Sequence, residues 1–225
     1  MNVSMSLVAL MAGIGLGVGV LLNAIVYRAQ RGERGGVSVR YVSVEVAGAV
    51  LFAALTLRFG VTAQLPAYLY LVTVGVALTM MDFDLRRLPD SIILPSYVVT
   101  VMLLMPAGAA SGNWYSGVRA LTGMVALLAL YFALALAYPN GLGFGDVKLA
   151  GLVGLYLGWL SWNALFITAA GSLLIACVGG SAAAVSKHSG TAVAVRITPC
   201  LVSAAVLALF VTVPISNWYA SLLPA

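Results

Sequence analysis

The stretch Gly143-Phe144-Gly145-Asp146-Val147-Lys148 lies between two long apolar runs, in a chain of which only 8% of the residues are charged. Asp146 therefore lies at or just inside a membrane boundary, where burying its charge at a helix centre costs roughly 2.5–3.5 kcal/mol. The two glycines let the backbone bend and let another segment approach Asp146. A plain glycine-rich turn with a snorkelling lysine is the structural alternative. A second acidic cluster, Asp82 to Asp90, favours a functional site.

Apolar residues make up 63% of the 225 residues, and runs of about 20 of them recur along the whole length. We therefore expect an all-α, polytopic membrane helical bundle that forms a single domain over residues 1–225. The first run lacks basic residues ahead of it, so it is expected to be a retained span and not a cleaved signal. The eight predicted spans are about 4–27, 42–58, 66–82, 91–107, 117–137, 147–160, 163–185 and 197–215.

The distribution of basic residues supports eight spans and predicts their orientation. Eight spans place nine of the eleven basic residues on one face of the membrane, whereas fusing the sixth and seventh leaves only seven there. Basic loops stay in the cytoplasm, so the face with nine is expected to be cytoplasmic. Because these residues sit in short loops, the net charge of +5 predicts no nucleic-acid partner. The nine are Arg28, Arg31, Arg34, Arg40, Arg86, Arg87, Lys148, Lys187 and Arg196; the other two are Arg58 and Arg119.

Both acidic clusters then face the cytoplasm, with Asp82 at the end of the third span and Asp146 at the start of the sixth. Two carboxylates within a few ångströms cannot both ionise easily, so one keeps a proton. The ionised one can take a proton from water while the other donates to a carbonyl oxygen, which is aspartyl peptide hydrolysis. A single histidine, His188, in a polar loop and two cysteines in apolar runs point to no serine–histidine pair, no metal and no cofactor.

The remaining polar residues near these ends have structural alternatives. Asp84 and Asp90 flank two arginines, so local ion pairing explains them. Asp90 also follows a proline and suits the N-cap of the fourth span. Glu45, one turn into the second span, is expected to pair with an arginine or to line the polar site. Asn23, near the inner end of the first span, could bond between helices or contact substrate.

In this order the motifs resemble those of the type IV prepilin peptidases, bacterial membrane aspartyl proteases with a GxGD motif. Residues 143–148 resemble the family's G-[YF]-G-D-x-K, and residues 81–90 its I-D…L-P-D segment. Leu21-Leu22-Asn23 with Tyr27-Arg28 resembles L-N…Y-R, and Arg40-Tyr41 with Glu45 resembles the opening of span two. The resemblance runs from about residue 13 to 200.

The resemblance implies an enzyme of the bacterial cytoplasmic membrane that removes the short basic leader of prepilins or pseudopilins at the cytoplasmic face. Its partners are then that leader and membrane lipid. Asp82 and Asp146 match the catalytic pair, and Asp84 is the nearest rival of Asp82. Substrate-binding or supporting positions are Gly143, Gly145, Lys148, Asn23, Glu45, Asp84 and Asp90.

The chain departs from the family in two places. The 28–40 loop holds no cysteine, whereas many members carry a four-cysteine zinc domain there that accompanies N-methylation, so methyl transfer is not expected. Arg196-Ile197-Thr198-Pro199 keeps only the last residue of a P-F-G-P turn, and no site role is assigned to it. Two alternatives stay open: an intramembrane protease of the signal-peptide-peptidase type, and a transporter or assembly factor that uses Asp82 and Asp146 for protons or ions.

Overall fold

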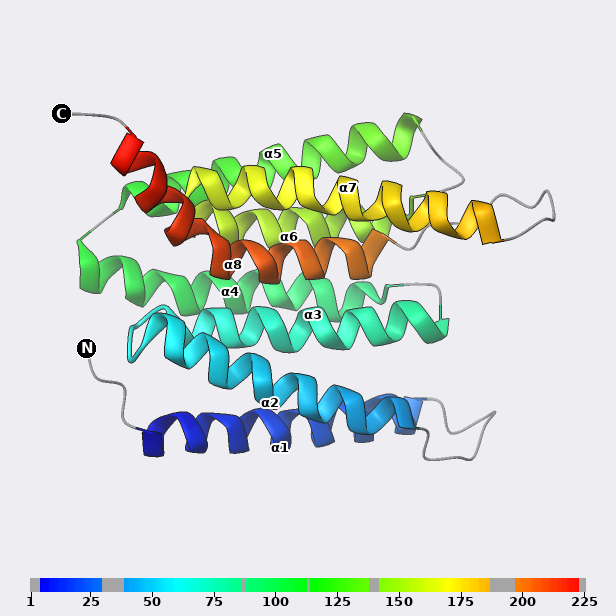
Figure 1. Cartoon of the computed structure of the whole chain (residues 1–225), viewed down its shortest axis with the longest axis horizontal. Coiled ribbons are helices and arrows are strands. Elements are labelled where there is room, and N and C mark those ends of the chain that lie inside the picture. Colours follow the sequence, from blue (N-terminus) through cyan, green and yellow to red (C-terminus); the bar gives the residue numbers. More distant parts are fainter. Residues whose placement is uncertain are drawn as a thin grey trace.

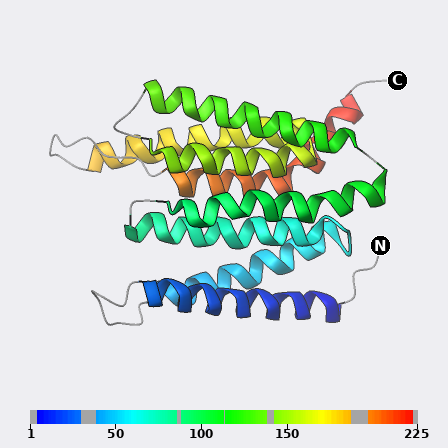
Figure 2. The ribbon, with the colours of Figure 1, turned by 180° about the vertical axis from the view of Figure 1, so that it is seen from behind.

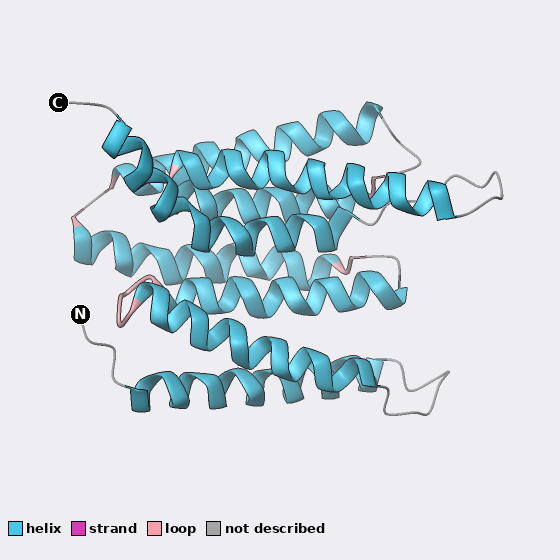
Figure 3. Cartoon of the chain, viewed as in Figure 1, coloured by secondary structure: helices cyan, strands magenta, loops and turns pink. Residues whose placement is uncertain are grey.

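The computed structural model describes residues 5–29, 39–85, 88–112, 114–137, 142–186 and 197–222. Side chains are described in these ranges except at 21–29, 39–44, 83–85, 111, 179–186 and 213–222. In this part of the chain every regular element is a helix (Figure 3), which confirms the all-α expectation. The eight helices are α1 Met5–Ala29, α2 Val39–Phe59, α3 Leu65–Leu85, α4 Asp90–Ser111, α5 Tyr115–Ala137, α6 Phe144–Leu160, α7 Trp162–Ser186 and α8 Ile197–Leu222.

Each helix covers one of the eight apolar runs, and the expected break between the sixth and seventh runs is confirmed. Ser161 separates α6 from α7 in an extended conformation, with φ −172° and ψ 163°. Its hydroxyl oxygen accepts a hydrogen bond from the backbone N–H of Ala164 at 3.0 Å, which caps the start of α7. Gly60 and Gly112, with φ of +61° and +65°, follow the ends of α2 and α4 in a conformation that other residues rarely adopt.

The helices run alternately up and down the bundle (Figures 1 and 2). The C-terminal ends of α1, α3, α5 and α7 therefore lie together with the N-terminal ends of α2, α4, α6 and α8. We call this the acidic end, because Asp82, Asp90 and Asp146 all lie in the helix turns there. Helices α1 and α2 pack against each other at one edge, and α3 joins them to the rest of the bundle.

Helix α6 is the centre of the bundle, and every residue from Leu149 to Trp159 is buried. A helix that is apolar on all sides is stable only when other helices surround it. Gly123 of α5 and Gly154 of α6 let the backbones of these two helices come close together. A Cβ on Gly154 would lie 2.5 Å from the carbonyl oxygen of Gly123. At the far end, Arg119 of α5 donates to the carbonyl oxygens of residues 158–160 and so satisfies the C-terminus of α6.

The outer surface of the bundle is apolar, as an integral membrane protein requires. Three helices are long and apolar enough to cross a membrane by themselves within the described ranges: Leu65–Asp82, Asp90–Ala110 and Tyr115–Ala137. Shorter apolar stretches lie in α1, α7 and α8. Large side chains such as Met102, Leu136 and Phe166 are exposed on this surface, and lipid is the solvent in which such exposure is stable.

Candidate active site

Asp146 lies in the first turn of α6, at the acidic end. Gly143 caps this helix with φ −83° and ψ 150°, and its backbone N–H donates to Oδ2 of Asp146 at 3.3 Å. The backbone N–H of Asp146 in turn donates to the carbonyl oxygen of Gly143 at 3.0 Å. The start of a helix carries a partial positive charge, so this position favours an ionised carboxylate.

The hydroxyl of Thr198, the second residue of α8, donates to Oδ1 of Asp146 at 2.5 Å. Thr198 is 1% exposed, so this contact lies inside the protein. No site role was predicted for residues 196–199 from the sequence, so the contact between Thr198 and Asp146 was missed. The only signal available was that α8 begins at the same end of the bundle as α6.

Two opposing effects act on the charge of Asp146, which precedes the predicted membrane segment 147–160. Burial raises the pKa of its carboxyl above the usual range, because removal from water penalises the charged form. The hydrogen bonds from Thr198 and from the backbone of Gly143 lower the pKa, and burial is the larger effect. A carboxyl in this setting keeps its proton to a higher pH than an exposed aspartate.

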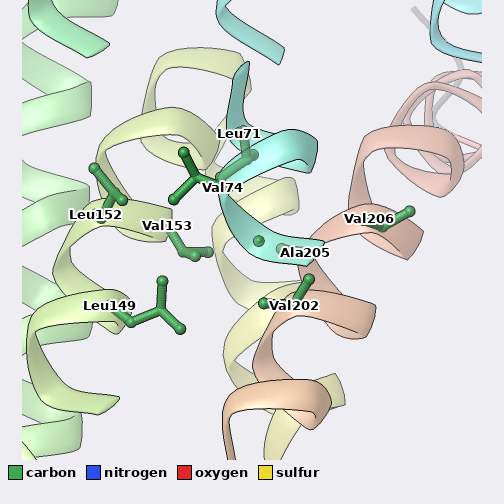
Figure 4. A pocket seen from close by; sticks show the side chains of 9 residues that line it. Leu71, Val74, Leu149, Leu152, Val153, Val202, Ala205 and Val206 are labelled. Atoms are coloured by element: carbon green, nitrogen blue, oxygen red, sulfur yellow. The ribbon is translucent and has the colours of Figure 1, made fainter. Parts of the chain in front are cut away.

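Asp82 lies in the last turns of α3, half-buried and with its Oδ2 atom inside the protein. Helices α3, α6 and α8 pack against one another and enclose a small apolar pocket (Figure 4). The pocket is lined by Leu71, Val74, Gly75, Leu149, Leu152, Val153, Val202, Ala205 and Val206.

The residues that line this pocket indicate which helix faces carry Asp82, Asp146 and Thr198. Gly75 precedes Asp82 by two helical turns on α3, Leu149 follows Asp146 by one turn on α6, and Val202 follows Thr198 by one turn on α8. Residues at these spacings lie on the same helix face. Asp82, Asp146 and Thr198 therefore belong to the three faces that meet at the α3–α6–α8 junction, at its acidic end.

Leu88, just before α4, and Asp90, the first residue of α4, both contact the start of α6. A Cβ on Gly145 would lie 2.7 Å from Cβ of Leu88, so the glycine allows a close approach there, as expected. At Gly143 a Cβ would meet only ordinary contacts, so closeness does not require glycine at that position. The second contact is an ion pair of 2.6 Å between Nζ of Lys148 and Oδ2 of Asp90.

The expectation that Asp90 is the N-cap of the fourth span was wrong. Pro89 is the capping residue, in an extended conformation with φ −73° and ψ 120°, and no side chain caps this end. Asp90 is the first residue of α4, and its carboxylate pairs with Lys148 across 58 positions of sequence. The hydroxyl of Tyr97, two turns along α4, donates to the backbone oxygen of Lys148 at 2.6 Å.

The remaining predicted positions lie elsewhere or outside the description. Glu45 is half-buried on α2, against α1, where a Cβ on Gly19 would lie 2.8 Å from its Cα. Asn23 falls in α1 and Asp84 in the last turn of α3, and their side chains are not among those described. Among the described residues no three acidic, histidine or cysteine side chains gather as metal ligands would.

The sequence also matches known proteins. A model described as the type IV leader peptidase family matches residues 69–185, a range that contains both Asp82 and Asp146. A prepilin leader peptidase/N-methyltransferase of Aeromonas hydrophila is 31% identical over 191 residues, which are 84% of this chain and 64% of that protein. The protein of the same name from Bacillus subtilis (strain 168) is 26% identical over 175 residues, 76% of this chain and 66% of that protein.

The match to the Aeromonas hydrophila protein thus spans less than two thirds of that relative's length. No solved structure matches the chain significantly. The family model covers more than half of the chain, including α4, α5 and α6 in full. This chain therefore belongs to the type IV leader peptidase family.

Proposed function

We propose that this protein is a membrane aspartyl endopeptidase that removes the short basic leader of prepilin-like or pseudopilin substrates at the cytoplasmic membrane face. The observation that carries the proposal is the setting of Asp146. Its carboxylate accepts hydrogen bonds from Gly143 and Thr198 at the start of α6, on a helix face that meets the Asp82 face of α3. Two aspartates on different helices at one junction can supply the general acid and the general base for hydrolysis of a peptide bond.

In the proposed reaction Asp82 and Asp146 share one proton. The ionised carboxylate takes a proton from water, and the resulting hydroxide attacks the scissile carbonyl carbon. The protonated carboxyl donates to the carbonyl oxygen, which gives a neutral tetrahedral intermediate. Return of a proton to the amide nitrogen as the C–N bond breaks releases the leader and the new amino terminus. The proton belongs to the pair and not to one residue, because strongly interacting carboxyls titrate together.

The proposed orientation has all eight helices crossing the bacterial cytoplasmic membrane with the acidic end in the cytoplasm. The distribution of nine of the eleven basic residues supports it. The leader of a membrane-inserted pilin subunit also lies on that side, so the aspartates would meet the bond without entering the lipid core. The name that both relatives carry, prepilin leader peptidase/N-methyltransferase, supports the substrate class.

The proposed activity is cleavage alone. The relatives' names include N-methyltransferase, but the loop between α1 and α2 in this chain holds no cysteine. A tetrahedral structural zinc site takes four ligands, usually cysteine or histidine. The 225 residues hold two cysteines and one histidine, which are too few for a zinc site built from these two residue types alone, and this supports the proposal.

The test is processing of a purified prepilin by the purified full-length protein. Asp82→Asn and Asp146→Asn should each lower the rate of leader removal by at least about 10²-fold, because an amide neither activates water nor shares the proton. Asp84→Asn and Asp90→Asn should lose much less. Mass spectrometry of the product reports both the cleavage site and the absence of an added methyl group.

Each of three results would contradict part of the proposal. Full activity of all four variants would exclude an aspartyl mechanism. Loss of activity in Asp84→Asn with retention in Asp82→Asn would move the catalytic role to the neighbouring carboxylate. A wild-type protein that cleaves no prepilin, while Asp82→Asn and Asp146→Asn abolish a proton or ion flux in vesicles, would favour the transporter alternative.

A further inference from the structure

Among the buried threonines that the structure describes, Thr198 is the one whose hydroxyl bonds a carboxylate, whereas Thr100 of α4 bonds the hydroxyl of Tyr156 on α6. Thr56, Thr168 and Thr212 each donate to the carbonyl oxygen four residues earlier in their own helix. Such bonds satisfy the hydroxyl locally and connect no two elements. Thr198 is the second residue of α8, and its hydroxyl reaches across 52 positions of sequence to Oδ1 of Asp146.

With this contact, both carboxylate oxygens of Asp146 accept a hydrogen bond. Oδ1 of Asp146 accepts from the hydroxyl of Thr198, and Oδ2 accepts from the backbone N–H of Gly143. A carboxylate held at one oxygen can still turn about its Cβ–Cγ bond, whereas one held at both has a fixed plane. Gly143, which caps α6, donates one of these hydrogen bonds, and Thr198 of α8 donates the other. The plane of the carboxylate therefore depends on how α8 packs against α6.

We propose that Thr198 is a positioning residue for Asp146: its hydroxyl fixes the plane of the carboxylate that cleavage uses. This role rests on the proposed peptidase function.

The kinetic test compares Thr198→Val, Thr198→Ser and Thr198→Ala in the prepilin assay. Valine keeps the shape of threonine and lacks the hydroxyl, whereas serine keeps the hydroxyl and lacks the methyl group. A hydrogen bond to a charged group corresponds to roughly a ten-fold to hundred-fold change in rate. We expect kcat to fall by about that factor in the valine and alanine variants with KM little changed, and serine to restore most of kcat.

Thr212→Val is the matched control. It makes the same substitution on the same helix, at a residue that is 4% exposed and donates only to Ala208. We expect kcat near that of the wild type. Thr198→Val with wild-type kcat, or Thr198→Ser less active than Thr198→Val, would overturn the proposal, since packing alone would then explain the site.

A second measurement separates this proposal from the proposed function. A hydrophobic carbodiimide modifies protonated carboxyl groups, and mass spectrometry can measure its addition to the peptide that holds Asp146. Titratable groups on the elements around Asp146 include Asp82 and Asp84 on α3, Asp90 and Tyr97 on α4, Tyr131 on α5, Lys148 on α6 and Cys200 on α8. All of them are unchanged in Thr198→Val.

Loss of the donated hydrogen bond favours the protonated form of Asp146, so the pH of half-maximal modification should rise by about one unit in Thr198→Val. It should return toward the wild-type value in Thr198→Ser. An unchanged modification profile would overturn the role of Thr198 even if the protein proved to be no peptidase. If the wild-type protein cleaves no prepilin but Thr198→Val still shows the shift, the proposed function is contradicted and the role of Thr198 at Asp146 stands.

Discussion

Among single residues, the Lys148–Asp90 ion pair holds the start of α4 against the start of α6, two residues after Asp146. Its side chains are 38% and 55% exposed, so water screens the pair, and such pairs contribute about 0–1 kcal/mol. Tyr97 independently holds the backbone oxygen of Lys148. The ion pair therefore adjusts a position that a second contact already supports.

Reversing the charges of Lys148 and Asp90 tests whether their ion pair has this modest effect. Lys148→Asp and Asp90→Lys alone each place like charges together, and we expect a decrease of roughly five-fold in the rate of leader cleavage, in line with an exposed pair. The double variant Asp90→Lys/Lys148→Asp restores opposite charges and should recover most of the rate. A double variant no more active than the weaker single variant would mean that Lys148 or Asp90 acts by itself, for instance on the leader.

The position of a residue at a helix end could be predicted from sequence where the motif adjoins an apolar run, whereas the catalytic role of Asp146 stays a prediction. The motif that holds Gly145 and Asp146 lies just before an apolar run, and the structure puts both residues at the start of α6. Thr198 could not be identified, since its partner is 52 positions away and nothing periodic connects them. Asp90 was placed correctly at a helix start but in the wrong role, because Pro89 already occupies the capping position.

Among the helices, α5 and α6 depend on glycine for their close packing. In a membrane no hydrophobic effect drives two helices together, so close backbone contact through small residues takes its place. Gly123, Gly154 and Gly158 line this contact, and a Cβ on Gly158 would lie 2.7 Å from the carbonyl oxygen of Arg119. Since α6 carries Asp146 in its first turn, separating it from α5 should disturb the site.

Gly154→Ala should therefore destabilise the protein by about 1–3 kcal/mol, the usual cost of overpacking. The added methyl group meets the backbone of Gly123, which cannot move aside as a flexible side chain could. A lower Tm in detergent and a reduced cleavage rate are expected. Gly17→Ala on α1 is the matched control, because nothing lies within 4 Å of a Cβ there. Equal Tm values for the two variants would show that the contact between α5 and α6 is not limiting.

The helix boundaries agree with the apolar runs within a few residues, apart from α8, which continues beyond its predicted end to Leu222. Run length alone sets such boundaries, because a helix must span the hydrocarbon layer. The inward faces could not be predicted in the same way. In α6 every position is apolar from Leu149 to Trp159, so no periodic pattern distinguishes the face that meets α5 from the face that meets α3 and α8.

For the molecule as a whole, the alternation of the helices decides which residues share a face of the membrane. Four helices begin and four end at the acidic end. The connections after α1, α3, α5 and α7 must therefore leave from that end, and these connections and the adjoining helix ends hold most of the basic residues. Arg58 and Arg119 belong to the opposite end, where Ser161 also lies. The packing fixes this grouping, and the charges predict which end is cytoplasmic.

Single cysteines in a background without Cys177 and Cys200 test that orientation in intact cells. Residues 35 and 189 come between α1 and α2 and between α7 and α8 in the sequence, and we expect no labelling of Gly35→Cys or Ser189→Cys by a membrane-impermeant thiol reagent from outside. The same positions should react in inverted membrane vesicles, where the cytoplasmic face is outermost. Asn163→Cys, an exposed position at the start of α7, should react in intact cells instead. Labelling of residue 35 or 189 from outside would reverse the orientation, and would put Asp82 and Asp146 on the side where the basic leader of a membrane-inserted substrate does not lie.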